Sequence, residues 1–498
     1  MTSHLPAGPV RVRFAPSPTG ELHAGGLRTA LFNYLVRRKS GGQFILRLED
    51  TDREREVPGA GERMMADLAW AGISFDEGLL EGGPYAPYRQ SERTHLYKET
   101  VELLLERDGA YRCWCSPQRL DDIRDSARRN DAPPRYDGRC RKLNPEERRK
   151  LQNQSRPSVI RLATPQGESV MVEDLIKGRV TFDSRHLDDP ILERSDDRPT
   201  AILAGAVDDH LMGVTHVIRG EEWLPSTPYQ MLIYRYLDWE PPIWAHLPLL
   251  LSRERSKLSK RDPGGSVAEL RREGFLPEAL CRYLVGLGRR NLPPDQGWDI
   301  GSLSNNFSLT DYTSGDAVFS IPALRSDNAH LLRRLPVSEL VRRSRSLLSE
   351  MLPEISSWDE TRLAAGLALV QGESVHLRDA VERLSKLIHP PEVPPALKGE
   401  FPATDRLLQT ISQILQTEPV EWKAEAIEET MRTTGKHLGL SGRDLFAPLR
   451  LAVTGTDRGP QLPRIAELLG RREFLRRIDA AGSLWKTDGA QPVSNKSR

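Results

Sequence analysis

The sequence has few cysteines, few aromatic residues and no long apolar run. Only four of the 498 residues are cysteine, too few for the disulfide framework of a small secreted protein. No apolar run reaches the ~18 residues of a membrane helix, so we expect no membrane partner. A strand-like segment begins almost at once, which leaves no room for a signal peptide and favours a cytoplasmic protein, with the mitochondrial matrix as the alternative.

The sequence also lacks an excess of either charge. Its 71 basic and 70 acidic residues give a formal net charge of +1, so composition alone does not indicate a nucleic-acid partner. Arginines nevertheless cluster in residues 333–345 and 471–477. Each cluster alone is typical of a solvated helix face, and phosphate contact is the other interpretation. The length predicts about three or more domains.

The most informative segment contains a strand end, a Pro/Gly turn and a helix start within residues 13–26. The helix is predicted to open with the sequence His23, Ala24, Gly25, Gly26. Free backbone N–H groups and the helix dipole favour an anion at such a start, and glycine lets the backbone come close to it. The segment therefore predicts a site for the phosphates of a nucleotide.

A second element, residues 257–261, reads Lys-Leu-Ser-Lys-Arg and is typical of a loop that can move over a triphosphate. Residues 10–73 read strand, helix, strand, helix, which is half of a nucleotide-binding sheet. Such sheets bind ligands beyond the carboxyl ends of their strands, so residues 13–17 and 49–52 are predicted to meet in one pocket. Beyond about residue 335 the segments are Leu-rich amphipathic helices.

Five segments occur in an order and spacing that resembles glutamyl-tRNA synthetase, a class I aminoacyl-tRNA synthetase of bacterial and organellar type. They are residues 13–26, 44–52, 88–93, 207–213 and 275–280. The resemblance implies an α/β fold: a Rossmann-type parallel sheet, split by an insertion that binds the acceptor end of tRNA, and then an all-α anticodon-binding half. The implied domains are residues 1–105 and 196–245 for the two catalytic halves, 106–195 for the insertion with the cysteines, 246–335 for the lysine loop and stem contacts, and 336–498 for the helical region.

The resemblance also implies the reaction and its residues. L-glutamate would be attached to tRNA(Glu) for protein synthesis, through a glutamyl-adenylate, by a monomer that uses ATP and Mg²⁺. The positions that match catalytic residues of the family are His23, Lys257 and Lys260. The positions that match its ATP-binding residues are Pro16, His23, Gly25, Gly26, Ser259 and Lys260. The positions that match its glutamate-binding residues are Arg13, Ser17, Glu49, Ala201, Gly205 and Arg219.

Two positions of the implied glutamate pocket differ from the family pattern. Ala201 and Gly205 stand where a tyrosine and an asparagine are usual. Each missing hydrogen bond costs roughly 0.5–1.5 kcal/mol. Two alternatives therefore stay open: a drifted paralogue that uses another amino acid, and a protein that binds tRNA without catalysis. A truncated relative that modifies a tRNA base is opposed by the helical half, and charging of tRNA(Gln) stays open.

Three of the four cysteines lie close together in the sequence, namely Cys113, Cys115 and Cys140. The resemblance implies a zinc site with Tyr136 as the fourth ligand, because Lys142 occupies the position of the family's histidine. Zinc in structural sites takes four tetrahedral ligands. Two interpretations stay open: Zn²⁺ bound by these four residues, or three reduced thiols without a metal.

Overall fold

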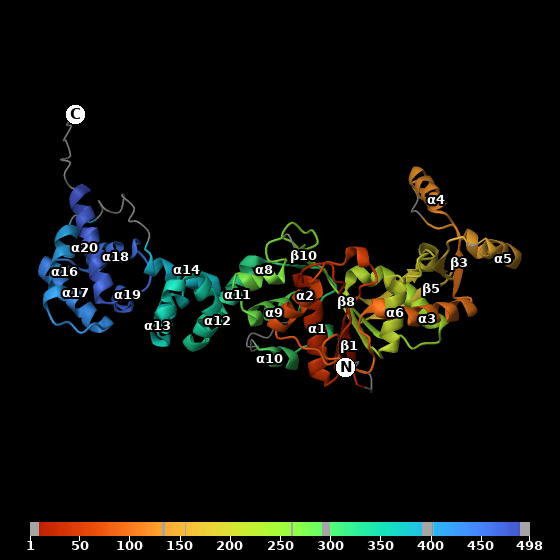
Figure 1. Cartoon of the computed structure of the whole chain (residues 1–498), viewed down its shortest axis with the longest axis horizontal. Coiled ribbons are helices and arrows are strands. Elements are labelled where there is room, and N and C mark those ends of the chain that lie inside the picture. The colour runs from red at the N-terminus through yellow and green to blue at the C-terminus, as the bar shows by residue number, and fades with distance from the viewer. Residues whose placement is uncertain are drawn as a thin grey trace, which may run out of the picture. The chain divides into compact units, whose positions relative to one another are not determined.

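The computed structural model describes residues 9–131, 135–154, 156–259, 262–290, 299–390, 401 and 403–488. The chain forms two compact units. The first contains Met1–Arg272 and Pro277–Leu324, and the second contains Glu273–Leu276 and Arg325–Arg498. Among the described residues, no helix combines the length and the apolar character of a membrane span. Figure 1 labels many of the helices and some of the strands.

Two parallel strand pairs form the centre of the first unit. β1 (Arg11–Phe14) pairs with β2 (Gln43–Leu46), and α1 (Ala24–Ser40) connects them. β8 (His216–Gly220) pairs with β9 (Ile243–Leu247) in the same way. The backbone N–H of Thr215 donates to the Arg11 carbonyl at 2.9 Å and joins the two pairs just before β8 begins.

A hairpin from the predicted insertion extends this sheet. β5 (Ser169–Asp174) and β6 (Gly178–Asp183) are antiparallel, and the last residue of β5 lies parallel to Trp244 of β9, which gives the order β6-β5-β9-β8. Burial alternates along β5, as it does in a strand with one face in the core. The sheet is therefore mixed, whereas the sequence predicts a parallel one. The five-domain division stays a prediction.

The rest of the predicted insertion forms a small antiparallel sheet of β3 (Ala110–Cys113), β4 (Val159–Leu162) and β7 (Ile191–Glu193). Ser116 and Asn144 cap the two helices of this region, and Asn144 forms a reciprocal capping box with Glu147. Those helices are α4 (Pro117–Arg129) and α5 (Pro145–Asn153). Neither helix buries a side chain, so capping is the main local support for their first turns.

The remaining described elements of the first unit surround the sheet or follow it. They are α2 (Ala60–Trp70), α3 (Thr94–Glu106), α6 (Ala201–Leu211), α7 (Thr227–Tyr236), β10 (Leu250–Leu251), α8 (Val267–Arg272), α9 (Pro277–Gly286), α10 (Ile300–Asn305) and β11 (Ala317–Val318), with short 3₁₀ turns at Arg53–Arg55, Gln90–Glu92, Arg139–Lys142, Ser184–His186, Glu221–Ser226 and Leu309–Asp311. Buried side chains of α3, α6 and α7 pack in one hydrophobic cluster, which fixes the positions of α6 and α7 beside the sheet.

The second unit is helical, as the amphipathic pattern predicts. α11 (Ile321–Arg334) begins in the first unit and enters the second. The other described helices are α12 (Val337–Met351), α13 (Glu360–Gln371), α14 (Leu377–Ile388), α16 (Thr404–Thr417), α17 (Ala424–Leu438), α18 (Gly442–Thr454), α19 (Leu462–Leu469) and α20 (Arg471–Asp488), with a 3₁₀ turn at Pro353–Ser357. The predicted α/β fold with a helical second half is confirmed.

One arginine of the second unit cannot make the phosphate contact that one interpretation of its cluster predicts. Arg477 of α20 is 5% exposed, and its Nη1 donates to the carbonyls of Leu387 and Val453, both at 2.8 Å. A buried guanidinium that donates to carbonyls of other helices links those helices by hydrogen bonds and is not accessible to RNA. The interpretation is therefore wrong for Arg477, because sequence alone does not show which side of a helix is buried.

A buried histidine on β8 predicts acid sensitivity. Burial lowers the pKa of His216 to about 4, and its Nε2 has no hydrogen-bond partner among the described residues. The unfolded chain binds this proton below about pH 6.5 whereas the folded chain does not, so stability falls by about 2 kcal/mol between pH 6.5 and 5. We expect His216→Leu to reduce the fall in melting temperature over this range in scanning calorimetry. Equal falls in both proteins would contradict the prediction.

Candidate active site

A cavity of about 630 Å³ lies in the first unit, at the turn after β1, the start of α1 and the end of β8. Most residues that the sequence predicts for the site line it: Arg13, Pro16, Ser17, His23, Gly25, Gly26, Glu49, Ala201, Gly205, Arg219 and Lys257. Ser259 does not line it, and Lys260 lies outside the described residues. The expected meeting of residues 13–17 with Glu49 is thus found, because both segments follow paired parallel strands.

His23 is the N-cap of α1, with extended backbone angles of φ −94° and ψ 160°. Its Nδ1 accepts the backbone N–H of Gly26 at 2.9 Å. A ring nitrogen that accepts carries no proton, so the proton of this imidazole is on Nε2. His23 therefore has a donor of the kind that a phosphate oxygen needs, at the positive end of the α1 dipole.

The two glycines of the motif make room for neighbouring side chains. A Cβ at Gly25 would lie 3.1 Å from Nδ1 of His23, and a Cβ at Gly26 would lie 2.9 Å from Cδ1 of Leu22. Both distances are shorter than ordinary carbon contacts. Gly25 thus leaves space for the His23 ring at the helix start, whereas Gly26 leaves space for Leu22.

Arg219 near the end of β8 is a buried cation without a carboxylate partner among the described residues. It is 8% exposed and donates to three neutral acceptors: His246 Nε2 at 3.1 Å, Thr227 Oγ1 at 2.9 Å and Gln230 Oε1 at 2.8 Å. Burial is the main cause that lowers the pKa of Arg219 to about 9, and the nearby charge of Arg13 adds to it. A buried charge is normally paired, so the cavity beside Arg219 favours an anionic ligand.

His246 accepts a hydrogen bond from Arg219 and is itself held in one tautomer by Asp174. Nδ1 of His246 lies 2.6 Å from Asp174 Oδ2, while Nε2 faces the guanidinium. Burial lowers the pKa of His246, partly offset by Asp174. The ring is therefore neutral with its proton on Nδ1, which leaves Nε2 free to accept from Arg219. Asp174 ends β5, so the hairpin from the predicted insertion supports the cavity from behind.

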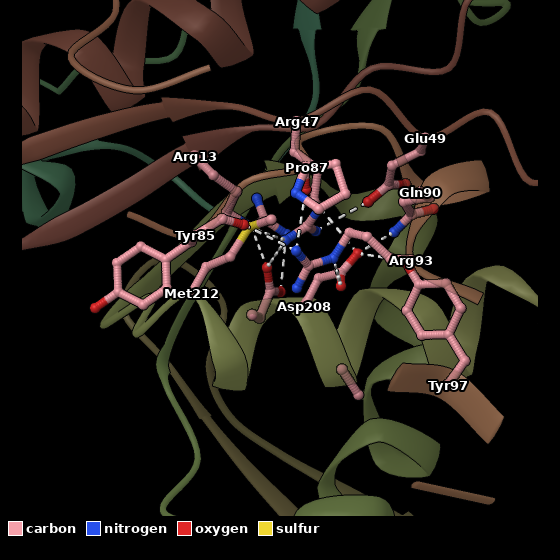
Figure 2. Close-up of polar contacts among 12 residues, drawn as sticks. Arg13, Arg47, Glu49, Tyr85, Pro87, Gln90, Arg93, Tyr97, Asp208 and Met212 are labelled. Carbon is pink, nitrogen blue, oxygen red and sulfur yellow. Dashed lines mark hydrogen bonds and ion pairs between the residues drawn. The ribbon is translucent and has the colours of Figure 1, made fainter. Parts of the chain in front are cut away.

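Arg13 is the second arginine of the cavity, and a carboxylate already fixes it. Its Nε and Nη2 donate to Asp209 at 3.0 and 3.4 Å. Arg47 donates to the same Asp209 at 2.8 Å and to Glu49 at 3.0 Å. Figure 2 shows Arg13, Arg47 and Glu49 in this group of contacts. Burial opposes the charge of Asp209, yet the two arginines outweigh it and lower its pKa.

Glu49 is one of several acidic residues that line the cavity, and it is the one paired with Arg47. Its side chain is 14% exposed, and burial raises its pKa, although Arg47 acts in the opposite direction. An ammonium group placed beside Glu49 would favour the ionised form. Glu49 thus has the charge and the partial accessibility that a ligand ammonium requires.

Asp208 anchors α6 from below the cavity. It accepts hydrogen bonds from Arg93 Nε at 2.7 Å, Gln90 Nε2 at 2.9 Å and the Tyr97 hydroxyl at 2.8 Å. Figure 2 shows Arg93, Gln90 and Tyr97 around this carboxylate. Asp208 and Asp209 are adjacent on α6, so the helix carrying Ala201 and Gly205 is fixed to both α3 and the strands.

Lys257 marks the mouth of the cavity. Its Nζ lies 3.5 Å from Glu222 Oε1, and its side chain is 57% exposed. An ion pair this exposed holds the lysine weakly, so Lys257 can move to an anion in the cavity. Ser259 N donates to Asp262 Oδ2 at 2.6 Å, which forms a turn in the same segment.

The three cysteines of the predicted metal cluster meet around one hydroxyl. The Sγ atoms of Cys113, Cys115 and Cys140 all lie within 4.8 Å of one another. The Tyr136 hydroxyl lies 3.4 Å from Cys113 Sγ and 3.5 Å from Cys115 Sγ. Lys142 is exposed. Three thiols and a phenol are thus placed together, and the three thiols are ligands of the type that a tetrahedral zinc ion takes.

Several residues of the site were not singled out by the sequence. Asp174, His246 and Gln230 belong to no recognisable motif, and Arg47 and Asp209 lie inside segments that the resemblance uses only as landmarks. One signal was available: Arg219, which is predicted to bind glutamate, needs acceptors nearby that orient it. It could not identify them, because they come from two elements that lie apart from Arg219 in the sequence, β9 with His246 and α7 with Thr227 and Gln230.

Two family models match the chain. "tRNA synthetases class I (E and Q), catalytic domain" matches residues 9–311, and "Anticodon binding domain" matches residues 339–482. The first model covers more than half of the chain and contains the whole cavity. The second lies within the helical unit.

Similar proteins of known name agree with these matches. The chain is 37% identical to the glutamate–tRNA ligase of Geobacillus thermodenitrificans, over 95% of this chain and 98% of that protein, and 39% identical to that of Moorella thermoacetica over the same shares. It also resembles the crystal structure of a glutamate tRNA ligase from Elizabethkingia meningosepticum in complex with its amino acid, with a TM-score of 0.87, 34% identity and coverage of 96% and 99%. With this cavity, these matches and both domains in order, the chain belongs to the glutamate–tRNA ligase family of class I aminoacyl-tRNA synthetases.

Proposed function

We propose that this chain attaches L-glutamate to tRNA(Glu) for protein synthesis, with ATP as the energy source. The observation that carries the proposal is Arg219, a buried guanidinium with only neutral partners among the described residues, beside a second arginine and an acid in one cavity. Glutamate has two carboxylates and one ammonium, so it needs two cations and one anion. Arg219, Arg13 and Glu49 supply them.

In the first step the α-carboxylate of glutamate attacks the α-phosphate of ATP, and pyrophosphate leaves. The chain contributes position and charge rather than a covalent group. Nε2–H of His23 donates to a phosphate oxygen, and Lys257 with Lys260 neutralises the departing pyrophosphate. Mg²⁺ bound to the phosphates would neutralise further charge, and carboxylates of Asp52 and Glu222 line the cavity as oxygen donors of the type it takes.

In the second step a hydroxyl of the terminal tRNA nucleotide attacks the glutamyl carbonyl, and AMP leaves. The hydroxyl loses its proton as the ester bond forms, and the leaving phosphate group of AMP can accept that proton. The small antiparallel sheet with α4 and α5 would bind the acceptor end, and the helical unit the anticodon. We place the enzyme in the cytoplasm as a monomer.

The test is aminoacylation of tRNA by the purified chain with ATP, Mg²⁺ and, separately, glutamate, glutamine and aspartate. We expect charging with glutamate alone and loss of charging in Lys260→Ala. Charging with another amino acid would support the drifted paralogue instead. Retained tRNA affinity without charging by any of the three would support a protein that only binds tRNA.

We also propose that Cys113, Cys115, Cys140 and Tyr136 hold one structural zinc ion, on the strength of the thiol geometry. The purified chain should contain about one zinc per molecule by elemental analysis, since four such ligands complete a tetrahedral site. Cys140→Ser should lose most of the metal, and Cys281→Ser, which changes a buried cysteine outside the cluster, should keep it. Metal-free protein with unchanged stability would support three reduced thiols.

A further inference from the structure

The side-chain amide of Gln230 on α7 lies in the cavity with a fixed orientation. Gln230 is 2% exposed and lines the cavity. Its Oε1 accepts a hydrogen bond from Arg219 Nη2 at 2.8 Å. A guanidinium only donates, so the oxygen of the amide must face Arg219 and the NH₂ group must face the other way. The chemistry of the two groups thus fixes which amide atom is which.

The NH₂ group of Gln230 has no hydrogen-bond partner among the described residues. Its neighbour across the cavity is Gly205 of α6, where an added Cβ would lie 3.0 Å from Gln230 Nε2. That separation is too short for an ordinary side chain without a shift of the amide. The amide therefore occupies the space that a side chain at position 205 would need. Gly205 has no side chain, so the two do not clash. Ala201, one turn earlier on α6, likewise leaves the cavity open.

From this geometry we infer that Gln230 is a glutamate-binding residue, whose Nε2–H donates to the substrate carboxylate held by Arg219. The inference rests on the proposed function and names a residue for that site. One amide then serves two partners: its oxygen orients the arginine, and its nitrogen supplies a donor that α6 does not. The family's hydrogen-bond donors at positions 201 and 205 of α6 are absent, and Gln230 of α7 supplies a donor in their place. Ala201 and Gly205 therefore do not by themselves imply that the substrate is an amino acid other than glutamate.

The test exploits the competition between positions 205 and 230 for one space. Three variants are compared with the unsubstituted chain: Gln230→Ala, Gly205→Asn and the double variant. The KM for glutamate in aminoacylation and the Kd for L-glutamate by calorimetry are measured for each, together with the KM for ATP. Gln166→Ala, at an exposed glutamine outside the cavity, is the matched control.

We expect Gln230→Ala to raise the KM and Kd for glutamate by about tenfold to a hundredfold, the usual effect of one lost hydrogen bond to a charged group. Gly205→Asn alone should also weaken binding, because the asparagine meets the amide. In the double variant the introduced asparagine has the space and supplies a donor, so binding should recover to within about fivefold of the unsubstituted chain. The KM for ATP should change less than about twofold throughout, as should both glutamate constants in Gln166→Ala.

If Gln230 only orients Arg219, an asparagine on α6 cannot replace it, and the losses in the double variant will be additive. Additive losses, or an unchanged Kd in Gln230→Ala, would overturn the inference while leaving the proposed function intact. An unsubstituted chain that neither binds nor charges glutamate would overturn both. Melting curves of all variants identify any loss of binding that comes from misfolding.

Discussion

Replacement of Arg219 by methionine is expected to abolish efficient use of glutamate without weakening the fold. Loss of one partner of a buried charge pair costs about 2–5 kcal/mol, so the Kd for L-glutamate should rise by roughly thirtyfold to a few thousandfold. The melting temperature should stay equal or rise, because burial lowers the pKa of Arg219 to about 9 and therefore disfavours the charged group. Calorimetric titration and thermal melting of the same sample measure both effects.

Arg219→Lys is the matched control for charge. Lysine keeps the cation but lacks the planar fork that contacts three acceptors and a carboxylate at once, so we expect intermediate binding. The KM for ATP should change by less than about threefold in both variants, since Arg219 lies beside the amino-acid part of the cavity rather than the α1 start. A Kd for glutamate that stays within about threefold in Arg219→Met would contradict the assignment of Arg219.

Asp209→Asn is expected to have the largest effect on stability. Asp209 is 1% exposed and receives hydrogen bonds from both Arg13 and Arg47. Breaking a buried ion pair leaves an unpaired charge and costs about 3–5 kcal/mol. Because asparagine has nearly the same shape, the loss reports charge rather than packing. Urea unfolding followed by tryptophan fluorescence measures it.

The pH dependence of this loss follows from the direction of the Asp209 shift. Despite burial, Arg13 and Arg47 lower the pKa of Asp209. Its contribution is therefore fully present above about pH 4, the value in the unfolded chain, and is lost only as the pH falls through the lower folded pKa. We expect the same loss at pH 7.5 and 5.5. Asp196→Asn, which removes a partly exposed pair with Arg198, should change stability by less than about 0.5 kcal/mol.

The sequence predicts the parts of the site that local pattern determines. The turn after β1, the histidine at the start of α1 and the acid after β2 follow from strand, turn and cap chemistry, and the structure brings them to one cavity. The second unit follows from helical periodicity. In each case the deciding interactions lie within a few residues along the chain or at the ends of paired strands.

Interactions between distant segments were not predictable in the same way. The inferred role of Gln230 depends on two residues distant in the sequence: Arg219 fixes the orientation of its amide oxygen, and Gly205 leaves space beside its amide nitrogen. Read alone, the losses at Ala201 and Gly205 suggest a weakened pocket. Arg477 is the converse case, because the basic cluster suggested an exposed arginine and the structure shows a buried one. Both cases depend on which face of a helix is covered, and no local pattern settles that.

The β5–β6 hairpin limits how this enzyme can be recombined with its relatives. In the sequence, residues 106–195 resemble a separate insertion that could be exchanged as a unit. Asp174 within them nevertheless accepts a hydrogen bond from His246, and His246 in turn orients Arg219. A chimera that exchanges this segment also exchanges part of the support for amino-acid selection. Grafted segments must therefore carry their own carboxylate at the end of that strand, because the segment proposed to bind the acceptor end and the cavity proposed to bind glutamate share this support.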